Sequence, residues 1–358
     1  MIIEFMQEKA THSPENQIGI GVMSGTSLDG LDLALCRFDS NGYEILEFCC
    51  VDFPSVLKNS LANVHLANGL NYFEIENEYS YFVAAAIRDF HSNTGTRASF
   101  AGIHGQTIFH QPESQLTVQM LNGALVAAVS GLPTVCDFRR GDVASGGQGA
   151  PLVPIGDRDL FGDYSACLNL GGFANISLKK DEVRMAYDIC PVNIVLNLLA
   201  RNENKEYDAE GQLAASGELD SDLLNRLNSL IFYDQKPPKS LGREWMENQI
   251  LPLLRGIQNR AALRTFTEHA AQQITQNLPK KGRVLVTGGG AYNDFLISNI
   301  RKQLPTTEII IPRSELIEGK EALIFAYLAK LRLDQKINVL SSATGAAHNS
   351  CTGAVYIP

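Results

Sequence analysis

The stretch that decides the fold is GVMSGTSLDGLDLALCRF, residues 21–38, in which two apolar runs flank a short polar turn. The apolar runs predict one strand over residues 18–23 and a second over residues 31–38. The turn combines glycine, hydroxyl and carboxylate residues. Because glycine tolerates positive φ and lets a ligand approach main-chain amides, the stretch predicts a strand–turn–strand unit whose turn can bind an anion.

Outside this stretch, apolar strands followed by glycine turns recur along the chain. Residues 43–53 continue as a third strand, and residues 74–92 show a helical period with Tyr79, Phe82, Val83, Ala86 and Ile87 on one face. ACLNLGGFANISLKK (166–180) reads as strand, Gly-Gly turn, strand, and RVLVTGGGAYNDFLISNIRKQL (283–304) as strand, three glycines, helix. Further helices are expected as two within 244–278 and one over 319–333. The two similar glycine hairpins suggest two related halves.

Composition limits the class of protein. The chain has 358 residues, which predicts two domains, and its 45% hydrophobic content is typical of a folded protein. The net charge of -9 argues against a general nucleic-acid or membrane-surface binder. No apolar run reaches membrane-spanning length, and residues 1–17 read as a loose extension without a signal peptide. Seven cysteines without a CxxC pair indicate reduced thiols in the cytoplasm rather than disulfides or zinc.

Three glycine turns, each following an apolar strand, are the strongest candidates for a ligand site: Gly25-Thr26-Ser27, Gly171-Gly172 and Gly288-Gly289-Gly290. Two such hairpins can clamp a polyphosphate, and the third suits the sugar or base of a nucleotide. Each alone could be an ordinary tight turn. The P-loop, GxGxxG, GxSxG and HExxH motifs are all missing from the sequence, which excludes the commonest alternatives.

Several charged residues leave two interpretations open. Asp29 beside a phosphate turn either holds Mg²⁺ or caps the turn. Asp188, at a predicted strand end before Pro191, is a general base or a turn-forming residue. The run DFRRGD, which contains Arg139 and Asp142, is a solvated charge cluster by default, although the glycines of SGGQGAP beyond it favour a loop around a polar ligand. His104 and His110 suit substrate hydrogen bonding or a structural role better than zinc. The lone tryptophan, Trp245, is a core residue or a stacking surface.

Six motifs occur in the order and spacing of one known family. They are GVMSGTSLDGLD, IHGQTIFHQP, DFRRGDVASGGQGAPLVP, LNLGGFANIS, PPKSLGRE and VTGGGAYN. Over residues 18–356 the chain therefore resembles the anhydro-N-acetylmuramic acid kinases of the actin, Hsp70 and sugar-kinase superfamily. The resemblance implies an α/β fold of two ribonuclease-H-like (actin-like ATPase) domains around an interdomain cleft. We expect these domains at 18–140 and 141–358, with the extreme C-terminus packing back on the first.

The resemblance also implies an activity. Such enzymes open 1,6-anhydro-N-acetylmuramic acid with water and phosphorylate the freed 6-oxygen with ATP and Mg²⁺, giving N-acetylmuramic acid 6-phosphate in cytoplasmic peptidoglycan recycling. Homodimers are expected. Asp188 would activate the water, and Asp29 is the tentative Mg²⁺ ligand. Substrate contacts are expected from His104, Gln106, Arg139, Asp142 and Asn193. ATP contacts are expected from Gly25, Thr26, Ser27, Leu28, Asp29, Gly30, Leu31, Asp32, Gly171, Gly172, Asn175, Thr287, Gly288, Gly289, Gly290 and Asn293.

The sequence departs from the family pattern in the motif that contains the expected general base, Asp188. In the D-x-G-P-x-N motif, Cys190 stands where the family has glycine, and Val192 replaces a second common glycine. Three alternatives follow: a kinase for another amino sugar, a sensor of the same fold that binds without turnover, and a nucleotide-dependent chaperone or filament protein. A chain of 358 residues has no room for a peptide-binding domain, which argues against a chaperone.

Overall fold

The computed structural model describes residues 17–25, 28–181, 183–237 and 239–358. The chain divides into two compact units, each with its own sheet and hydrophobic core. Unit 1 contains the chain up to Gly141 together with segments 322–337 and 351–358, and unit 2 contains residues 142–321 and 338–350. The predicted boundary after residue 140 lies next to this division. The predicted second domain is one continuous range, however, whereas unit 2 is interrupted by a segment of unit 1.

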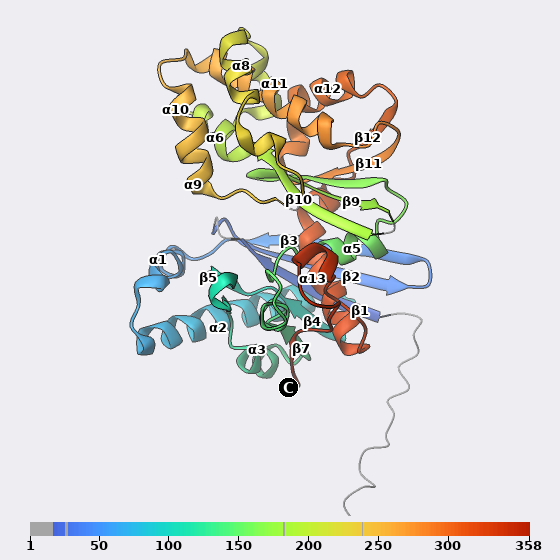
Figure 1. The fold of residues 1–358 in the computed structure, drawn as a ribbon. Coiled ribbons are helices and arrows are strands. Elements are labelled where there is room, and N and C mark those ends of the chain that lie inside the picture. Colours follow the sequence, from blue (N-terminus) through green and yellow to red (C-terminus); the bar gives the residue numbers. More distant parts are fainter. Residues whose placement is uncertain (1–16, 26–27, 182, 238) are drawn as a thin grey trace, which may run out of the picture. The chain divides into compact units, whose positions relative to one another are not determined.

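Unit 1 is built on a six-stranded sheet of order β13-β7-β4-β1-β2-β3 (Figure 1). Its strands are β1 (Gln17–Ser24), β2 (Leu31–Asp39), β3 (Gly42–Val51), β4 (Phe100–Ile103), β7 (Thr134–Cys136) and β13 (Ala354–Tyr356). The first three strands are antiparallel neighbours, and β4 and β7 run parallel to β1. β13 pairs antiparallel with β7, so the last residues of the chain complete this sheet.

Among the helices of unit 1, α2 contains the helix predicted over residues 74–92. They are α1 (Ser55–Asn63), η1 (Val64–Leu66), α2 (Gly69–Asn93), η2 (Pro112–Ser114) and α3 (Gly123–Ser130), and a hairpin of β5 (Gln106–Gln111) and β6 (Leu116–Met120) lies between them in the chain. On α2, Tyr79, Val83 and Ile87 are fully buried. A fully buried side chain of this kind contributes about 1.5–3 kcal/mol, so this face anchors the helix in the core.

The helix α13 (Ser314–Leu333) begins in unit 2 and continues into unit 1 from Ala322. Its backbone packs directly on the sheet of unit 1. A Cβ atom on Gly21 would lie 1.7 Å from the Ala322 carbonyl oxygen, and one on Gly102 would lie 2.2 Å from that of Phe325. Glycine at these two strand positions is therefore required by the close approach of the helix.

Unit 2 has a five-stranded sheet of order β10-β9-β8-β11-β12. Its strands are β8 (Ala166–Leu170), β9 (Phe173–Lys180), β10 (Val183–Pro191), β11 (Gly282–Thr287) and β12 (Thr307–Ile310). Three antiparallel strands are followed by two strands parallel to the first of them. Numbered in chain order within each unit, this sheet and the first five strands of the unit 1 sheet both read 3-2-1-4-5, the ribonuclease-H-like arrangement, and β13 adds a sixth strand in unit 1. The similarity of the two glycine hairpins reflects this shared topology.

The helices of unit 2 flank this sheet (Figure 1). They are α5 (Pro154–Asp159), α6 (Asn193–Arg201), η3 (Ala209–Gly211), α7 (Gln212–Ala215), α8 (Ser221–Asn228), η4 (Ile231–Asp234), α9 (Arg243–Trp245), η5 (Met246–Ile250), α10 (Leu251–Leu254), α11 (Asn259–Asn277), η6 (Gly289–Tyr292), α12 (Asp294–Gln303) and α14 (Ser341–Thr344). α4 (Arg140–Ala144) contains the division between the units. The first helix expected within 244–278 is broken into α9, the π-helix η5 and α10, because Pro252 lacks the N–H that a continuous α-helix needs.

Candidate functional site

The loop between β1 and β2 is the first part of the site, in unit 1. Of its residues, Thr26 and Ser27 lie outside the described part of the chain. Leu28 has a left-handed backbone (φ 56°), and its N–H donates to the Gly25 carbonyl at 3.3 Å. The Asp29 side chain is exposed. The main chain therefore makes a tight turn that leaves one carboxylate facing outward.

The remaining residues expected to bind ATP in this loop, Gly30, Leu31 and Asp32, contact residues of the sheet of unit 1. A Cβ atom on Gly30 would lie 2.6 Å from the Cys50 Sγ, and Leu31 is fully buried in the core. Asp32 contacts the thiol of Cys50, which together with burial raises the pKa of that thiol to about 12. In unit 1, Gly30, Leu31 and Asp32 thus support the loop.

Buried polar side chains lie directly beneath this loop. The Ser24 hydroxyl donates to Gln106 Oε1, and Gln106 Nε2 donates to the Gly25 carbonyl at 3.3 Å. His104 Nδ1 lies 3.2 Å from the Ser24 carbonyl. His104 is only 5% exposed and Gln106 only 3%. These two predicted substrate ligands thus hold the backbone at the start of the loop.

Arg139 extends this network and determines which nitrogen of the His104 imidazole carries the proton. Its Nε and a terminal nitrogen lie 3.2 and 2.9 Å from His104 Nε2. A guanidinium only donates and a carbonyl only accepts, so Nε2 is unprotonated and Nδ1–H donates to Ser24. Burial and the Arg139 charge lower the pKa of His104 to about 3, which keeps the ring neutral at pH 7. Three predicted substrate residues of unit 1 are therefore in one hydrogen-bonded group.

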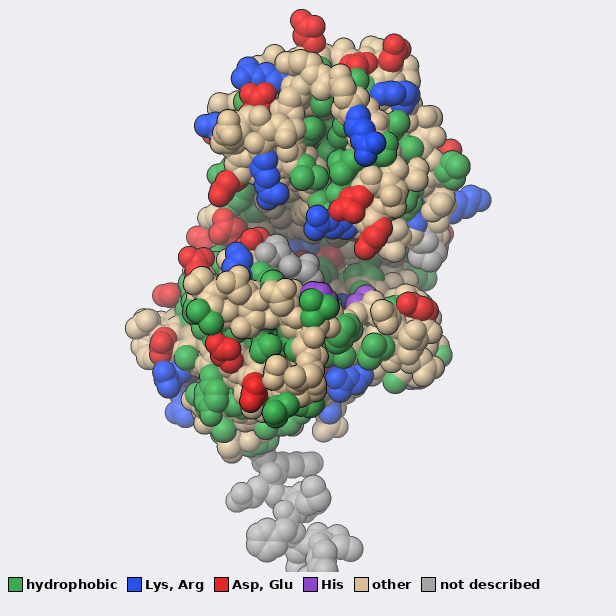
Figure 2. Space-filling view, turned by 90° about the vertical axis from the view of Figure 1, so that its left-hand side faces the viewer, with side chains coloured by type: hydrophobic (Ala, Val, Ile, Leu, Met, Phe, Trp, Pro, Cys, Tyr) green, Lys and Arg blue, Asp and Glu red, His purple; other side chains and the backbone are tan. Residues whose placement is uncertain are grey.

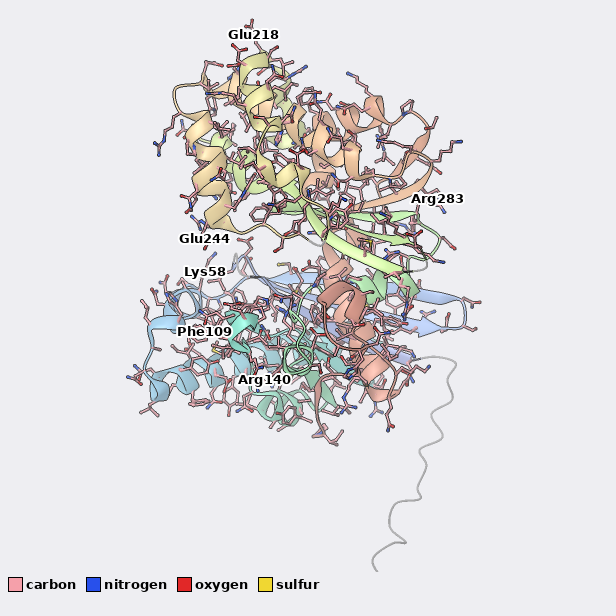
Figure 3. The ribbon with its side chains drawn as sticks, viewed as in Figure 1. Lys58, Phe109, Arg140, Glu218, Glu244 and Arg283 are labelled. Atoms are coloured by element: carbon pink, nitrogen blue, oxygen red, sulfur yellow. The ribbon has the colours of Figure 1, made fainter. Side chains whose placement is uncertain are left out.

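A cavity of about 160 Å³ lies in unit 1 next to this group. Its lining residues come from the loop, α1, η1 and β5: Leu28, Leu61, Ala62, Val64, His65, Gln106, Thr107 and Ile108. Figure 3 labels Lys58 in α1 and Phe109 in β5, two of these elements. The cavity combines an apolar wall with the polar edge of β5, which is the chemistry that a sugar needs.

In unit 2, polar side chains occupy one row across the sheet. The register pairs Asn169 of β8 with Asn175 of β9, and Asn175 with Asp188 of β10. The Gly171–Gly172 turn joins β8 and β9, and its carbonyls accept hydrogen bonds from the N–H groups of Val192, Asn193 and Ile194. The second glycine turn therefore lies beside the start of α6.

Asp188 occupies a bulge in β10, where the pairing with β9 shifts between Asp188 and Cys190. Its Oδ2 accepts the Leu241 N–H at 2.8 Å. Burial raises the pKa of the Asp188 carboxyl above its ordinary value, and the Leu241 N–H opposes this rise. Cys190 and Val192 are fully buried, and neither has a positive φ (that of Val192 is −134°). Side chains thus stand where the family pattern has glycine, and the Val192 backbone, with ψ −95°, lies outside the usual helical and extended regions.

The third glycine turn borders a larger cavity of about 330 Å³ in unit 2. It is lined by Asn193, Leu196, Asn197, Tyr207, Asp208, Glu210, Gly289, Tyr292 and Asn293. Gly288 has φ 80°, and a Cβ atom there would lie 2.5 Å from Asn169 Oδ1. The Asn193 side chain donates to the Leu170 carbonyl at 3.0 Å. Asn193, predicted to bind the sugar, therefore lies with the residues predicted to bind ATP.

Two further predicted residues of unit 2 are buried. Thr287 ends β11 and is 1% exposed. The Asp142 carboxylate is fully buried and accepts the Gly149 N–H and the Thr344 hydroxyl, both at 2.8 Å. A Cβ atom on Gly147 would lie 2.2 Å from Asp142 Oδ2. In unit 2 the glycine-rich loop thus wraps around the chain's own carboxylate.

Charge and metal-ligand groups add two observations. Acidic and basic side chains are interspersed over the face of unit 2 drawn in Figure 2. The described residues contain no group of three or more His, Cys, Asp or Glu side chains that could hold a metal ion. A magnesium ion bound mainly by nucleotide phosphates needs only one or two carboxylates, so an exposed Asp29 fits that kind of site.

Within the described residues, none of the helices has both the length and the apolar character to cross a bilayer.

Two ribonuclease-H-like units, each with glycine turns or loops beside polar side chains, define an α/β protein of the actin-like ATPase and sugar-kinase class. A family model described as anhydro-N-acetylmuramic acid kinase matches residues 17–358, and the chain belongs to this family. It is similar to the curated anhydro-N-acetylmuramic acid kinases of Vibrio cholerae (34% identity, covering 96% of this chain and 99% of the relative) and Pseudomonas savastanoi pv. phaseolicola (35%, covering 94% and 98%).

Among solved structures, the chain is similar to component A of the (R)-2-hydroxyglutaryl-CoA dehydratase of Acidaminococcus fermentans. The identity is 12% and the TM-score 0.45, over 87% of this chain and 96% of that one. It is also similar to a ROK family glucokinase of Streptomyces griseus, with 14% identity and a TM-score of 0.41, over 87% and 99%.

Sequence reasoning missed several residues of the site. Ser24 and Tyr79 lie under the first loop, where the Tyr79 hydroxyl is buried near Ser24. Tyr207 and Glu210 line the larger cavity, and Leu241 holds Asp188 through its main chain. The motif PPKSLGRE marked the right segment for Leu241, but a main-chain contact leaves no trace in the residue type.

Proposed function

We propose that Asp188 is the general base with which this kinase opens its substrate, 1,6-anhydro-N-acetylmuramic acid. The anhydro sugar has no free 6-hydroxyl. A base must therefore take a proton from water as the water oxygen bonds to the anomeric carbon and the bond to the bridging oxygen breaks. That oxygen becomes the 6-oxygen and accepts the γ-phosphoryl group of ATP, which releases ADP.

The observation that carries the proposal is the setting of the Asp188 carboxylate. It is largely buried, with one oxygen held by the Leu241 N–H. Burial raises the pKa of this carboxyl, which makes its ionised form a better proton acceptor than an ordinary aspartate. Because the ionised carboxylate is the active form, activity should fall as the pH drops through the raised pKa.

Each unit by itself contains a feature that suits part of a nucleotide. In unit 1, the glycine-containing loop after β1 has the residue types that can bind phosphate through main-chain amides. In unit 2, the cavity beside Gly289 and Asn293 has the mixed polar and apolar lining that an adenosine needs. Asp29 would hold Mg²⁺, which neutralises charge on the transferring phosphoryl group when it is bound.

The substrate residues would act in two ways. Arg139 is half-exposed and carries a charge that can bind an anionic or polar part of the sugar. His104, Gln106 and Asp142 are buried and bonded to main-chain groups, so they would shape the site rather than contact the sugar over a large area. Asn193 would serve the nucleotide side.

The test compares wild type with Asp188→Asn in phosphate transfer from ATP to purified 1,6-anhydro-N-acetylmuramic acid. We expect kcat to fall by about 100-fold or more, because a general base contributes about 10²–10⁴-fold. Binding of ATP should persist, since the carboxylate acts on water. An Asp188→Asn variant with wild-type kcat would contradict the proposal. Activity with free N-acetylmuramic acid in place of the anhydro sugar would favour a kinase for another amino sugar.

We also propose a cytoplasmic homodimer. All seven cysteines are free, as expected in a reducing compartment. Large apolar side chains are exposed along one stretch of unit 1, namely Val56, Leu66, Leu70 and Phe73, each at least 60% exposed. Such a concentration of exposed apolar side chains is typical of an interface. Sedimentation equilibrium of wild type and Phe73→Asp would test this, since a monomeric wild type contradicts it.

A further inference from the structure

A short segment lies along the edge strand that carries Asp188. β10 is the outer strand of the unit 2 sheet. The Asp188 N–H donates to the Lys239 carbonyl at 3.0 Å, and the Leu241 N–H donates to Asp188 Oδ2 at 2.8 Å. Residues 239 and 241 therefore hold both the backbone and the carboxylate of Asp188. Any shift of this segment changes where the carboxylate points.

The side chain of Lys239 ties this segment to η4. Its Nζ donates to the carbonyls of Phe232 and Tyr233, at 3.2 and 3.4 Å, and lies 4.6 Å from the centre of the Phe232 ring. An ammonium group has three donors, and two of them are taken by these carbonyls. The lysine thus closes a loop from η4 back to β10.

Tyr233 in turn anchors η4 to the core of unit 2. Its hydroxyl lies 2.9 Å from Nε2 of His269 on α11, and His269 Nδ1 lies 2.7 Å from Asn228 Oδ1. The asparagine oxygen only accepts, so Nδ1 carries the proton and Nε2 accepts from the tyrosine. His269 is fully buried. Trp245 packs edge-on against Tyr233, with ring centres 6.0 Å apart. A rigid series of contacts therefore leads from α11 to the Lys239 segment.

We propose that Lys239 is a positioning residue for the Asp188 base: by bonding the carbonyls of Phe232 and Tyr233, it fixes the 239–241 segment so that the Leu241 N–H orients the carboxylate. This inference rests on the proposed role of Asp188. A positioning role differs from substrate binding in what it changes. Loss of orientation lowers kcat, whereas loss of a substrate contact raises KM.

The experiment measures kcat, both KM values and the pH dependence of kcat for Lys239→Met, Lys239→Arg and Lys236→Met. Lys236 is an exposed lysine of the same loop and serves as the matched control. For Lys239→Met we expect kcat to fall about tenfold to a hundredfold, the cost of a small misplacement, with both KM values within about twofold of wild type. The acidic limb of the kcat profile should move to higher pH, because the Leu241 N–H no longer favours the ionised carboxylate.

The other variants define the outcome. Lys239→Arg keeps a cation that donates to carbonyls and should recover most of kcat, while Lys236→Met should match wild type. Trp245 is the only tryptophan, so its fluorescence reports whether the segment around Tyr233 stays packed in each variant. Figure 3 labels Glu244, directly before it in α9. If Lys239→Met does not fold, Tyr233→Phe removes only the hydroxyl and should shift the pH profile in the same direction.

Three results would overturn the inference. An increased KM for the sugar at unchanged kcat would make Lys239 a substrate ligand. Identical behaviour of Lys239→Met and Lys236→Met would leave no positioning role. An unmoved pH profile with a lower kcat would separate the lysine from the Asp188 carboxylate. Asp188→Asn, assayed in parallel, distinguishes these failures from failure of the proposed function: if that variant is fully active, the base itself is wrongly assigned.

Discussion

At the scale of single residues, Cys190 and Val192 show how a departure from a family pattern is absorbed. Both side chains are fully buried in the core of unit 2, and the backbone at both positions lies outside the left-handed region that favours glycine. The sensor alternative depended on a change in backbone freedom at these positions. Neither position has the positive φ that would require glycine, so this feature of the structure gives no reason to expect a loss of turnover.

Replacing Cys190 by glycine, the residue of the family pattern, should therefore lower the stability of this protein. Cys190→Gly removes a buried side chain and adds backbone freedom to the unfolded state, so we expect a loss of about 2–3 kcal/mol in the free energy of unfolding. Cys190→Ala keeps the Cβ atom and should lose less. Urea unfolding followed by Trp245 fluorescence checks both values. Neither variant should increase kcat, and a Cys190→Gly protein that is more stable than wild type would refute the argument.

At the scale of elements, the glycine turns were predictable because glycine is visible in the sequence and follows apolar strands. The strand pairs around 25 and 172 and the turn at 288 occur where the pattern indicates. Helices such as α6 and α8 escaped prediction because they have only nine and eight residues, although Asp220 caps the start of α8. Contacts made by main-chain groups, like that of Leu241 with Asp188, cannot be predicted from residue type at all.

Gly288, in the turn after β11, has a matched control in Gly256, which lies between α10 and α11. Gly288 (φ 80°) faces Asn169 and the Leu170 backbone, whereas Gly256 (φ 77°) has open space around an added Cβ. Gly256→Ala should cost only the strain of positive φ, about 1–2 kcal/mol. Gly288→Ala adds a clash that displaces the turn beside the cavity proposed to bind the nucleotide. We expect calorimetric titration with ATP to show at least about a tenfold weaker affinity for Gly288→Ala and no change for Gly256→Ala. Equal affinities would remove this turn from the ATP site.

At the scale of the whole molecule, the two units share more than strand order. Each buries one neutral histidine in a polar group: His104 beneath the first loop of unit 1 and His269 behind the 232–241 segment of unit 2. The shared topology could be predicted from the two glycine hairpins. The histidines could not, because a sequence shows neither burial nor the Arg139 and Tyr233 contacts that select one tautomer. Their burial links folding to pH in each unit separately.

Acid should therefore destabilise both units through these two groups. Burial lowers the pKa of His104 and of His269 to about 3, so between roughly pH 6 and pH 4 only the unfolded chain takes up a proton at each. Stability falls as pH falls, with a slope near 1.4 kcal/mol per pH unit for each histidine. Burial raises the pKa of the Asp137 and Asp188 carboxyls, and this effect makes stability rise as pH falls. It is the same in wild type and in the histidine variants, so it does not affect the difference between their slopes. The free energy of unfolding of His104→Gln and of His269→Gln, measured by urea unfolding across this pH range, should change with pH less steeply than that of wild type. The expected difference in slope is the contribution of one histidine. His348→Gln, at an exposed position, should keep the wild-type slope. If His269→Gln keeps the wild-type slope too, the imidazole in unit 2 is not held neutral by its contacts, and the anchor assigned to Tyr233 is weaker than the geometry implies.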